Sequence, residues 1–274
     1  MPSPATRPPC GPHSDRASVI ALHSSASGAR QWEPWREFLP GAVELVAPEL
    51  IGYEDGGGWN PAASLELADE AQRLAPLLER EPGGVHLLGH SYGGAVALEL
   101  ALRWPQRVRS LTLYEPVRFG LLQAPGTRAL RAEALALGHA VGALVREQRL
   151  REAAERFVDY WSGAGAWEAC NGRRRAGIAQ AMPKVMAEFG ALFSDAVPVH
   201  AWRRLAMPVR LLCGSRSPAP TQRIAELLAQ ICPRATLQRL EGLGHMGPVQ
   251  APARVAAAVD FRRMLLCAPR AAAA

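Results

Sequence analysis

A serine between two glycines stands where an apolar run meets a helical pattern, in the sequence LLGHSYGGAVALELAL of residues 87–102. To aim the Ser91 hydroxyl away from a strand, the chain must turn sharply, which puts Ser91 in strained backbone geometry. Gly89 and Gly93 suit this turn, because a side chain at either position would clash with the neighbouring strand or helix. Ser91 then precedes a helix whose positive dipole end favours developing negative charge. The pattern predicts a nucleophilic serine; the alternative is a tight turn in which Ser91 only caps the helix.

His245 is the predicted general base for this serine. It lies in LEGLGHMGP (240–248), a glycine-rich loop between the last predicted strand and the last predicted helix. Imidazole suits the role because it takes and returns a proton near neutral pH. The alternative is a histidine on a surface loop that has no role in catalysis. We expect His90, inside the serine motif, to be structural, and His23 to position its own loop.

A carboxylate is needed to orient His245 and to stabilise its protonated form. Glu115, in LTLYEPV (111–117), is the candidate. It follows the predicted strand beside the one that leads to Ser91, so both side chains are expected at the same edge of the sheet. The alternative is a structural glutamate that caps the following helical segment or pairs with Arg118. Weaker candidates in loops or helical segments are Asp195, Glu54 and Asp55.

Short apolar runs alternate along the chain with longer stretches of helical period. We predict strands at residues 18–25, 42–50, 84–91, 108–116, 207–214 and 235–242, and helices at 64–80, 92–103, 220–231 and 249–265. This alternation predicts an α/β fold with a mostly parallel central sheet and helices on both faces. Residues 120–202 break the pattern, because they are helical in period and carry no strand signal. They form a predicted helical insertion between the fourth and fifth strands.

These motifs, in this order, resemble the α/β-hydrolase superfamily over about residues 18–265. The resemblance implies a serine-nucleophile, esterase-like member with its nucleophile, acid and histidine in that chain order. It implies a helical cap at 120–202, inserted after the Tyr114/Glu115 strand, and a core at 18–119 and 203–267. We expect disordered ends at 1–17 and 268–274. The short segment before the first strand predicts that the family's first β-hairpin is reduced or missing.

The resemblance also exposes a departure from the family. Members usually place their acid in the loop after the fifth strand predicted here, and this sequence reads LLCGSRSPAP there, with Ser217 at the aspartate's place. A serine hydroxyl cannot carry the required charge. Some members carry the acid at the end of the strand before the cap, which is the position of Glu115. We therefore expect Glu115 to replace the usual aspartate.

The segment LHSSASGARQW (22–32) resembles the family's oxyanion loop. By position, the backbone N–H groups of Ser25 and Tyr92 would receive the carbonyl oxygen of the substrate. One such donor is typically worth roughly 3–4 kcal/mol in the transition state. Ser24 stands where the family usually has glycine, which would narrow the oxyanion hole or add a hydroxyl. The alternative is an ordinary Ser/Gly loop.

The substrate is expected to be a small molecule with an apolar acyl or aryl group, because aromatic and methionine side chains gather in the insertion. The residues concerned are Phe157, Tyr160, Trp161, Trp167, Met182, Met186, Phe189 and Phe193. The alternative is that they form the core of the insertion. We predict substrate contacts from Ser24, Tyr53, Trp161 and Met246.

Composition argues against several other classes of protein. The net charge is +6, but the arginines are scattered and Lys184 is the only lysine, so no nucleic-acid surface is indicated. The 5 cysteines form no CxxC pair, so neither a zinc site nor a disulfide framework is predicted. No metal or cofactor motif is recognised. The N-terminal residues lack the apolar region of a signal peptide, and no apolar run is long enough for a membrane span. We expect a cytoplasmic protein of open oligomeric state.

The predicted function is hydrolysis of a carboxylic ester or thioester through an acyl-enzyme, as in a carboxylesterase. Ser91 would attack, His245 would transfer the proton and Glu115 would support the histidine. Two alternatives stay open. The same triad could serve carbon–carbon bond hydrolysis or perhydrolysis. The fold could also act as a non-catalytic receptor for a small ligand.

Overall fold

The computed structural model describes residues 16–266, apart from the side chains of Asp55, Arg263 and Leu266. The end expected at 268–274 lies outside these residues, and so does the expected tail at 1–17 except for its last two residues. Ala17 already belongs to the first strand, where it pairs with Val43. The tail expected from the sequence therefore extends too far.

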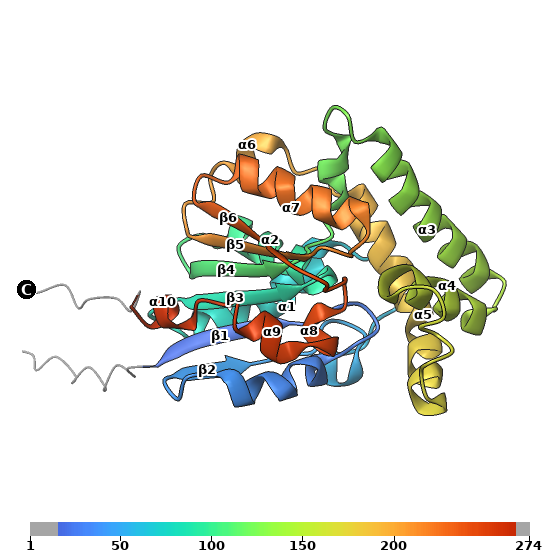
Figure 1. Cartoon of the computed structure of the whole chain (residues 1–274), viewed down its shortest axis with the longest axis horizontal. Helices are drawn as coiled ribbons and strands as arrows, with labels where there is room; N and C mark the ends of the chain where they lie inside the picture. The colour runs from blue at the N-terminus through green and yellow to red at the C-terminus, as the bar shows by residue number, and fades with distance from the viewer. Residues whose placement is uncertain (1–15, 267–274) are drawn as a thin grey trace, which may run out of the picture.

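A six-stranded sheet forms the centre of the molecule, and every neighbouring pair of its strands is parallel (Figure 1). The spatial order is β2-β1-β3-β4-β5-β6. The strands are β1 (Ala17–Leu22), β2 (Val43–Val46), β3 (Val85–His90), β4 (Val108–Tyr114), β5 (Val209–Gly214) and β6 (Ala235–Leu240). Each overlaps one predicted run, which confirms the predicted fold class. The segment before β1, where the family's first β-hairpin was expected to be reduced or missing, lies outside the described residues.

Helices cover both faces of this sheet. Successive strand residues point to opposite faces, and the strands carry apolar residues on both of them. Ile20 and Leu22 belong to one apolar cluster, whereas Val19 and Ala21 belong to a second. The first cluster includes residues of α1 (Leu67–Glu79), α2 (Tyr92–Arg103) and α7 (Ala219–Ile231). The second includes residues of the 3-10 helix η1 (Ala29–Phe38) and of the C-terminal helices. Two buried apolar layers thus hold the sheet between them.

The predicted helix at 249–265 is wrong as a single element. The structure has three short helices there: α8 (Gly247–Gln250), α9 (Pro252–Ala256) and α10 (Phe261–Leu266). Pro252 lacks a backbone N–H and disfavours helical geometry in the residue before it. Ala251 is accordingly outside the helical region, with φ −141° and ψ 56°, so the helical pattern is interrupted at this proline.

The segment between β4 and β5 contains only helices. These are η3 (Phe119–Gln123), α3 (Arg128–Arg146), α4 (Leu150–Ser162), α5 (Gly172–Ser194) and α6 (Val199–Trp202). Figure 1 shows α3, α4 and α5 grouped beyond one end of the sheet. Gly138 of α3 illustrates how closely they pack, because an added Cβ would lie 2.8 Å from the Phe193 ring of α5. We call α3, α4 and α5 the insertion. The remaining short element is η2 (Glu54–Gly56), after β2.

The turn from β3 into α2 is the most constrained part of the fold. Ser91 has φ 55° and ψ −117°, a conformation that non-glycine residues rarely adopt. A Cβ at Gly89 would lie 2.7 Å from the Cα of Gly94, and one at Gly93 would lie 2.3 Å from the carbonyl oxygen of Leu22. The two glycines therefore let β3, α2 and β1 approach closely enough to hold Ser91 in its strained geometry.

Gly93→Ala is expected to destabilise the protein by about 1–3 kcal/mol, because the added methyl group meets backbone atoms of β1. The melting temperature should fall by roughly 2–4 °C for each kcal/mol lost, measured by calorimetry or circular dichroism. Gly190→Ala is the control, because Gly190 lies in α5 with nothing within 4 Å of the added Cβ. That variant should gain roughly 0.5–1 kcal/mol. Equal melting temperatures for both variants would contradict this account of the turn.

Candidate active site

Ser91, His245 and Glu115 form one hydrogen-bonded chain, although they come from three distant parts of the sequence. The Ser91 hydroxyl lies 2.9 Å from His245 Nε2, and His245 Nδ1 lies 2.6 Å from Glu115 Oε2. Only 6% of Ser91, 2% of His245 and none of Glu115 is exposed. Parallel strands bring them together, because Ser91 and Glu115 each follow the carboxyl end of a strand and β3 and β4 are neighbours. The buried geometry lets His245 accept the serine proton while Glu115 holds the opposite ring nitrogen.

Glu115 is held by donors from the β5–α7 region. Its Oε1 accepts hydrogen bonds from the Gly214 N–H at 2.7 Å and from the Ser217 hydroxyl at 2.5 Å. Its Oε2 accepts one from the Thr221 hydroxyl at 3.0 Å, in addition to the bond from His245. A fully buried carboxylate is costly unless it is hydrogen-bonded. Ser217, at the position where the sequence suggested a missing acid, thus supports the carboxylate that stands near it.

The alternative partners for Glu115 and His245 are occupied elsewhere. Arg118 bonds to Glu99 at 3.1 Å and to Asp195 at 2.8 Å, so it is not the ion-pair partner of Glu115. Asp195 is correspondingly engaged with Arg118 at the end of α5, away from His245. Glu54 is exposed and pairs with Arg30. The side chain of Asp55 lies outside the described part of the chain.

Two aromatic residues fix the position of His245. The Trp161 ring of α4 lies 4.2 Å from the imidazole ring, centroid to centroid, at an interplanar angle of 31°. His90 Nε2 donates to the backbone carbonyl of His245 at 2.9 Å. Burial lowers the pKa of His90 well below its usual value, so this histidine stays neutral. His90 therefore supports the loop that carries His245, which is the structural role predicted for it.

The residues proposed for the oxyanion hole lie beside Ser91. Ser25 lines the same cavities as Ser91, and Tyr92 is the first residue of α2. Within residues 16–266, no protein acceptor bonds the backbone N–H of either residue. Neither N–H is therefore committed to a partner within the described chain.

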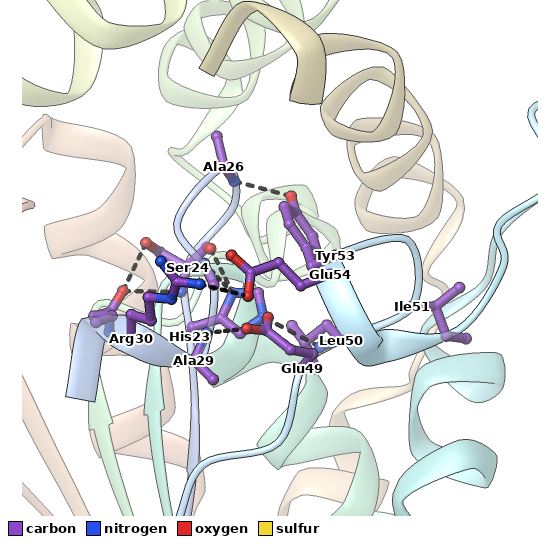
Figure 2. Close-up of polar contacts among 12 residues, drawn as sticks. His23, Ser24, Ala26, Ala29, Arg30, Glu49, Leu50, Ile51, Tyr53 and Glu54 are labelled. Atoms are coloured by element: carbon purple, nitrogen blue, oxygen red, sulfur yellow. Dashed lines mark hydrogen bonds and ion pairs between the residues drawn. The ribbon is translucent and has the colours of Figure 1, made fainter. Parts of the chain in front are cut away.

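His23 and Glu49 hold the loop that carries Ser25. In Figure 2 the His23 ring lies between this loop and the segment after β2. Its Nδ1 lies 2.9 Å from the Ser24 carbonyl oxygen, and its Nε2 lies 3.1 Å from the Leu50 nitrogen and 3.2 Å from Glu49 Oε2. Burial raises the pKa of Glu49, but hydrogen bonds from His23 and from the Ala29 N–H lower it further, so its pKa lies below the usual value. His23 thus positions the loop, as predicted, and Glu49 is a partner that sequence reasoning missed.

All four predicted substrate contacts line a cleft of about 710 Å³ next to Ser91 and His245. Ser24 and Tyr53 lie on the core side of this cleft, Trp161 lies in α4, and Met246 follows the histidine. The expectation of an aromatic-lined pocket holds only in part. Of the aromatic residues named in the insertion, Phe157 and Trp161 line the cleft, while its outer part is polar and includes Arg30, Arg173 and Arg174.

A smaller, mostly apolar space adjoins Ser91 and Ser25. Its volume is about 10 Å³, and its walls are Val117, Phe119, Phe157, Trp161, Val185, Glu188, Phe189 and Leu192. Two unequal compartments therefore meet at Ser91: an open polar cleft and a narrow apolar space.

A buried charge cluster that the sequence analysis missed lies behind this site. Lys184 Nζ is 2.9 Å from Glu188 and 3.1 Å from Glu70, and the Tyr53 hydroxyl donates to Glu188 at 2.9 Å. The only signals in the sequence were the isolated lysine and a glutamate four residues later, within the otherwise apolar stretch 181–193. The Tyr53 hydroxyl proton is therefore used within the protein.

Residues 19–258 match the family model described as "Alpha/beta hydrolase family". The chain belongs to this family. It is 26% identical to the pimeloyl-[acyl-carrier protein] methyl ester esterase of Aromatoleum aromaticum over 84% of this chain and 92% of the relative. It is 33% identical to the 2-hydroxymuconate semialdehyde hydrolase of a Pseudomonas species, over 35% of each chain. Several curated relatives are matched over only 35–39% of their length.

A solved structure supports the α/β-hydrolase fold independently. The thermophilic esterase of Thermogutta terrifontis superposes with a TM-score of 0.72 at 21% identity, covering 91% of this chain and 90% of that one. Among the described residues, no helix is both long and apolar enough to cross a bilayer. The same residues contain no group of three or more His, Cys, Asp or Glu side chains arranged to hold a metal ion.

Ser217→Asp is expected to make stability depend on pH. The new carboxylate would stand beside buried Glu115, and two adjacent carboxylates share one proton, so the pKa of one rises in the folded state. Stability is then highest below the unfolded pKa of about 4 and falls as the pH rises towards 7. Thermal melts from pH 4 to pH 8 measure this, with the neutral Ser217→Asn as control. A Ser217→Asp melting temperature that follows the control at every pH would contradict the close approach of residues 115 and 217.

Proposed function

We propose that this α/β hydrolase is a serine hydrolase that cleaves carboxylic esters or thioesters through an acyl-enzyme. The observation that carries the proposal is the continuous chain from Ser91 Oγ to His245 at 2.9 Å and on to Glu115 at 2.6 Å. The buried position of the chain next to an accessible cleft supports the proposal further.

The reaction follows from the proton positions in this chain. Ser91 Oγ attacks the substrate carbonyl carbon while His245 Nε2 takes the hydroxyl proton. The carbonyl oxygen becomes an oxyanion that receives hydrogen bonds from the Ser25 and Tyr92 N–H groups, and Glu115 stabilises the imidazolium. His245 then protonates the leaving alcohol or thiol, and the acyl group stays on Ser91. Water, deprotonated by the same histidine, releases the acid and restores the serine.

Carbon–carbon bond hydrolysis is the second candidate, because one relative is named as a 2-hydroxymuconate semialdehyde hydrolase. That reaction would use the same serine and histidine but would require a leaving group that departs as a carbanion equivalent. Comparing turnover of p-nitrophenyl esters with that of a vinylogous diketone distinguishes the two candidates. Higher kcat/KM for the diketone would reject ester cleavage as the main activity.

The triad assignment is tested with a fluorophosphonate probe and p-nitrophenyl acetate. The probe should label the unmutated protein and fail to label Ser91→Ala. Glu115→Gln should lower kcat by about three to four orders of magnitude, since loss of the acid's charge costs that much in a serine triad. Its melting temperature should stay within a few degrees of the parent value. Undiminished turnover in Glu115→Gln, or equal labelling of Ser91→Ala, would reject the assignment.

A double variant controls for the place of the acid. In Glu115→Gln with Ser217→Asp, the carboxylate moves to the side chain that already contacts residue 115. We expect this variant to regain at least part of the activity lost in Glu115→Gln alone. Ser217→Asn in the same background supplies no charge and should regain none.

The narrow space beside Ser91 predicts a preference for short acyl groups. A volume of about 10 Å³ has room for about one water molecule at most. We expect kcat/KM to fall at least about tenfold from p-nitrophenyl acetate to the octanoate, because overfilling a packed site costs about 1–3 kcal/mol. Phe189→Ala removes a wall of this space and should shift the preference towards longer chains.

Phe193→Ala is the matched control for that shift. Phe193 stacks on Phe119 with ring centroids 5.0 Å apart and lies 5.9 Å from the Phe189 ring. Phe193 does not line the space beside Ser91. A chain-length preference that changes equally in both variants would show that loosening of the insertion, not the wall at Phe189, sets the preference.

A further inference from the structure

A buried ionic cluster joins the insertion to the core directly behind the site. Lys184 and Glu188 come from α5, and Glu70 comes from α1. The ammonium group bonds to both carboxylates, at 2.9 and 3.1 Å. The three side chains are at most 3% exposed. The only lysine in the chain is thus almost completely buried.

One end of this cluster reaches the loop that carries Ser25. The Tyr53 hydroxyl donates to Glu188 and accepts from the Ala26 N–H, both at 2.9 Å. Figure 2 shows the second of these bonds, with Tyr53 directed at the residue after Ser25. Ala26 has φ 55°, a left-handed conformation that costs a non-glycine residue roughly 1–2 kcal/mol. Such a conformation persists only where its surroundings enforce it, and the Tyr53 hydroxyl is one of the groups that do so.

The other end of the cluster reaches Tyr92, whose backbone N–H is the second proposed donor. The Tyr92 hydroxyl donates to Glu70 at 3.3 Å. Lys184 Nζ lies 5.1 Å from the centre of the Tyr92 ring and 5.2 Å from that of Tyr53. The Lys184 ammonium group therefore lies near both tyrosine rings. Tyr53 bonds to the residue after Ser25, and Tyr92 itself carries the second proposed N–H donor.

Stability alone is a weak reason for such an arrangement. Well-packed apolar side chains are often as stabilising as a buried ion pair, or more so, because the charges must be desolvated. Burial lowers the pKa of Lys184, but Glu188 and Glu70 together outweigh burial and raise it, so the lysine stays charged. Burial raises the pKa of Glu70. What the cluster provides, and apolar side chains would not, is a set of directional bonds with fixed lengths.

We propose that Lys184 is a positioning residue for the oxyanion hole. Acting through Glu188 and Tyr53 on one side and through Glu70 and Tyr92 on the other, it sets the spacing between the Ser25 and Tyr92 N–H groups. The oxyanion hole thereby depends on α5 of the insertion. This inference rests on the proposed serine hydrolase activity, because in that reaction the two N–H groups would bind the oxyanion.

Tyr53→Phe tests the link to the loop, because it keeps the ring and removes only the hydroxyl. We expect kcat to fall about tenfold or more while KM changes less than about threefold, since complete loss of one oxyanion donor costs about 10²–10³ in kcat. Tyr160→Phe is the matched control, because the Tyr160 hydroxyl bonds to Glu133 within the insertion. It should leave both constants unchanged. A Tyr53→Phe variant that keeps its kcat, or loses only KM, overturns the proposal.

Lys184→Met tests the centre of the cluster with a readout that depends on pH. Without the ammonium group, Glu70 and Glu188 must share a proton, so the pKa of one rises and the folded state weakens as the pH increases above about 4. Adding Glu70→Gln removes that surplus charge and should restore the melting temperature. We expect kcat in this double variant to stay at least about tenfold below that of the parent. Recovery of kcat together with stability would show a merely structural lysine and overturn the proposal.

Amide hydrogen exchange keeps this test separate from that of the enzymatic activity. In Lys184→Met with Glu70→Gln, the Ala26 amide should exchange at least about tenfold faster than in the parent protein, although neither substitution touches Ala26. Unchanged exchange there would reject the coupling even if esters are hydrolysed. Faster exchange in a protein that hydrolyses no ester would uphold the coupling and reject only the proposed function.

Discussion

The short hydrogen bond between Glu115 and His245 is the interaction on which the site depends, and the parallel sheet makes it possible. Because β3 and β4 are neighbours and end at the same edge, the residues that follow them lie close together without any special loop. β5 then brings Gly214 to the same edge, where its N–H meets the carboxylate. The acid is therefore held by the backbone of the sheet as well as by side chains.

The region around Ser91 combines strained backbone with dense support. Ser91 and Glu115 both have positive φ, and Ala26 does as well. Ser91 and Glu115 are buried, and the Ala26 N–H bonds to the Tyr53 hydroxyl, and such surroundings are needed to maintain unfavourable backbone geometry. Strain at three separate segments thus converges on one small volume, and the remaining fold supplies the packing that holds it.

Local signals in the sequence were sufficient for some residues and insufficient for others. The strained turn at Ser91 could be predicted because its glycines and flanking periodicity act within a few positions, and the position of His245 next to it because of its loop. Glu115 required an argument about neighbouring strands. The Lys184 cluster could not be found in this way, because Glu70 lies 114 residues from Lys184 along the chain. The break at Pro252 was missed because apolar periodicity outweighed a proline signal that was present.

Glu115 stands only a few residues ahead of η3 and the insertion, at the end of the strand that leads into them. In a relative with its acid in the loop after β5, the carboxylate would not lie on the segment of backbone that leads into the insertion. Here the stretch of backbone after β4 carries Glu115, which bonds to His245, and then continues directly into the helices beside the cleft. A rigid-body movement of this segment that included residue 115 would break the hydrogen bond between Glu115 and His245.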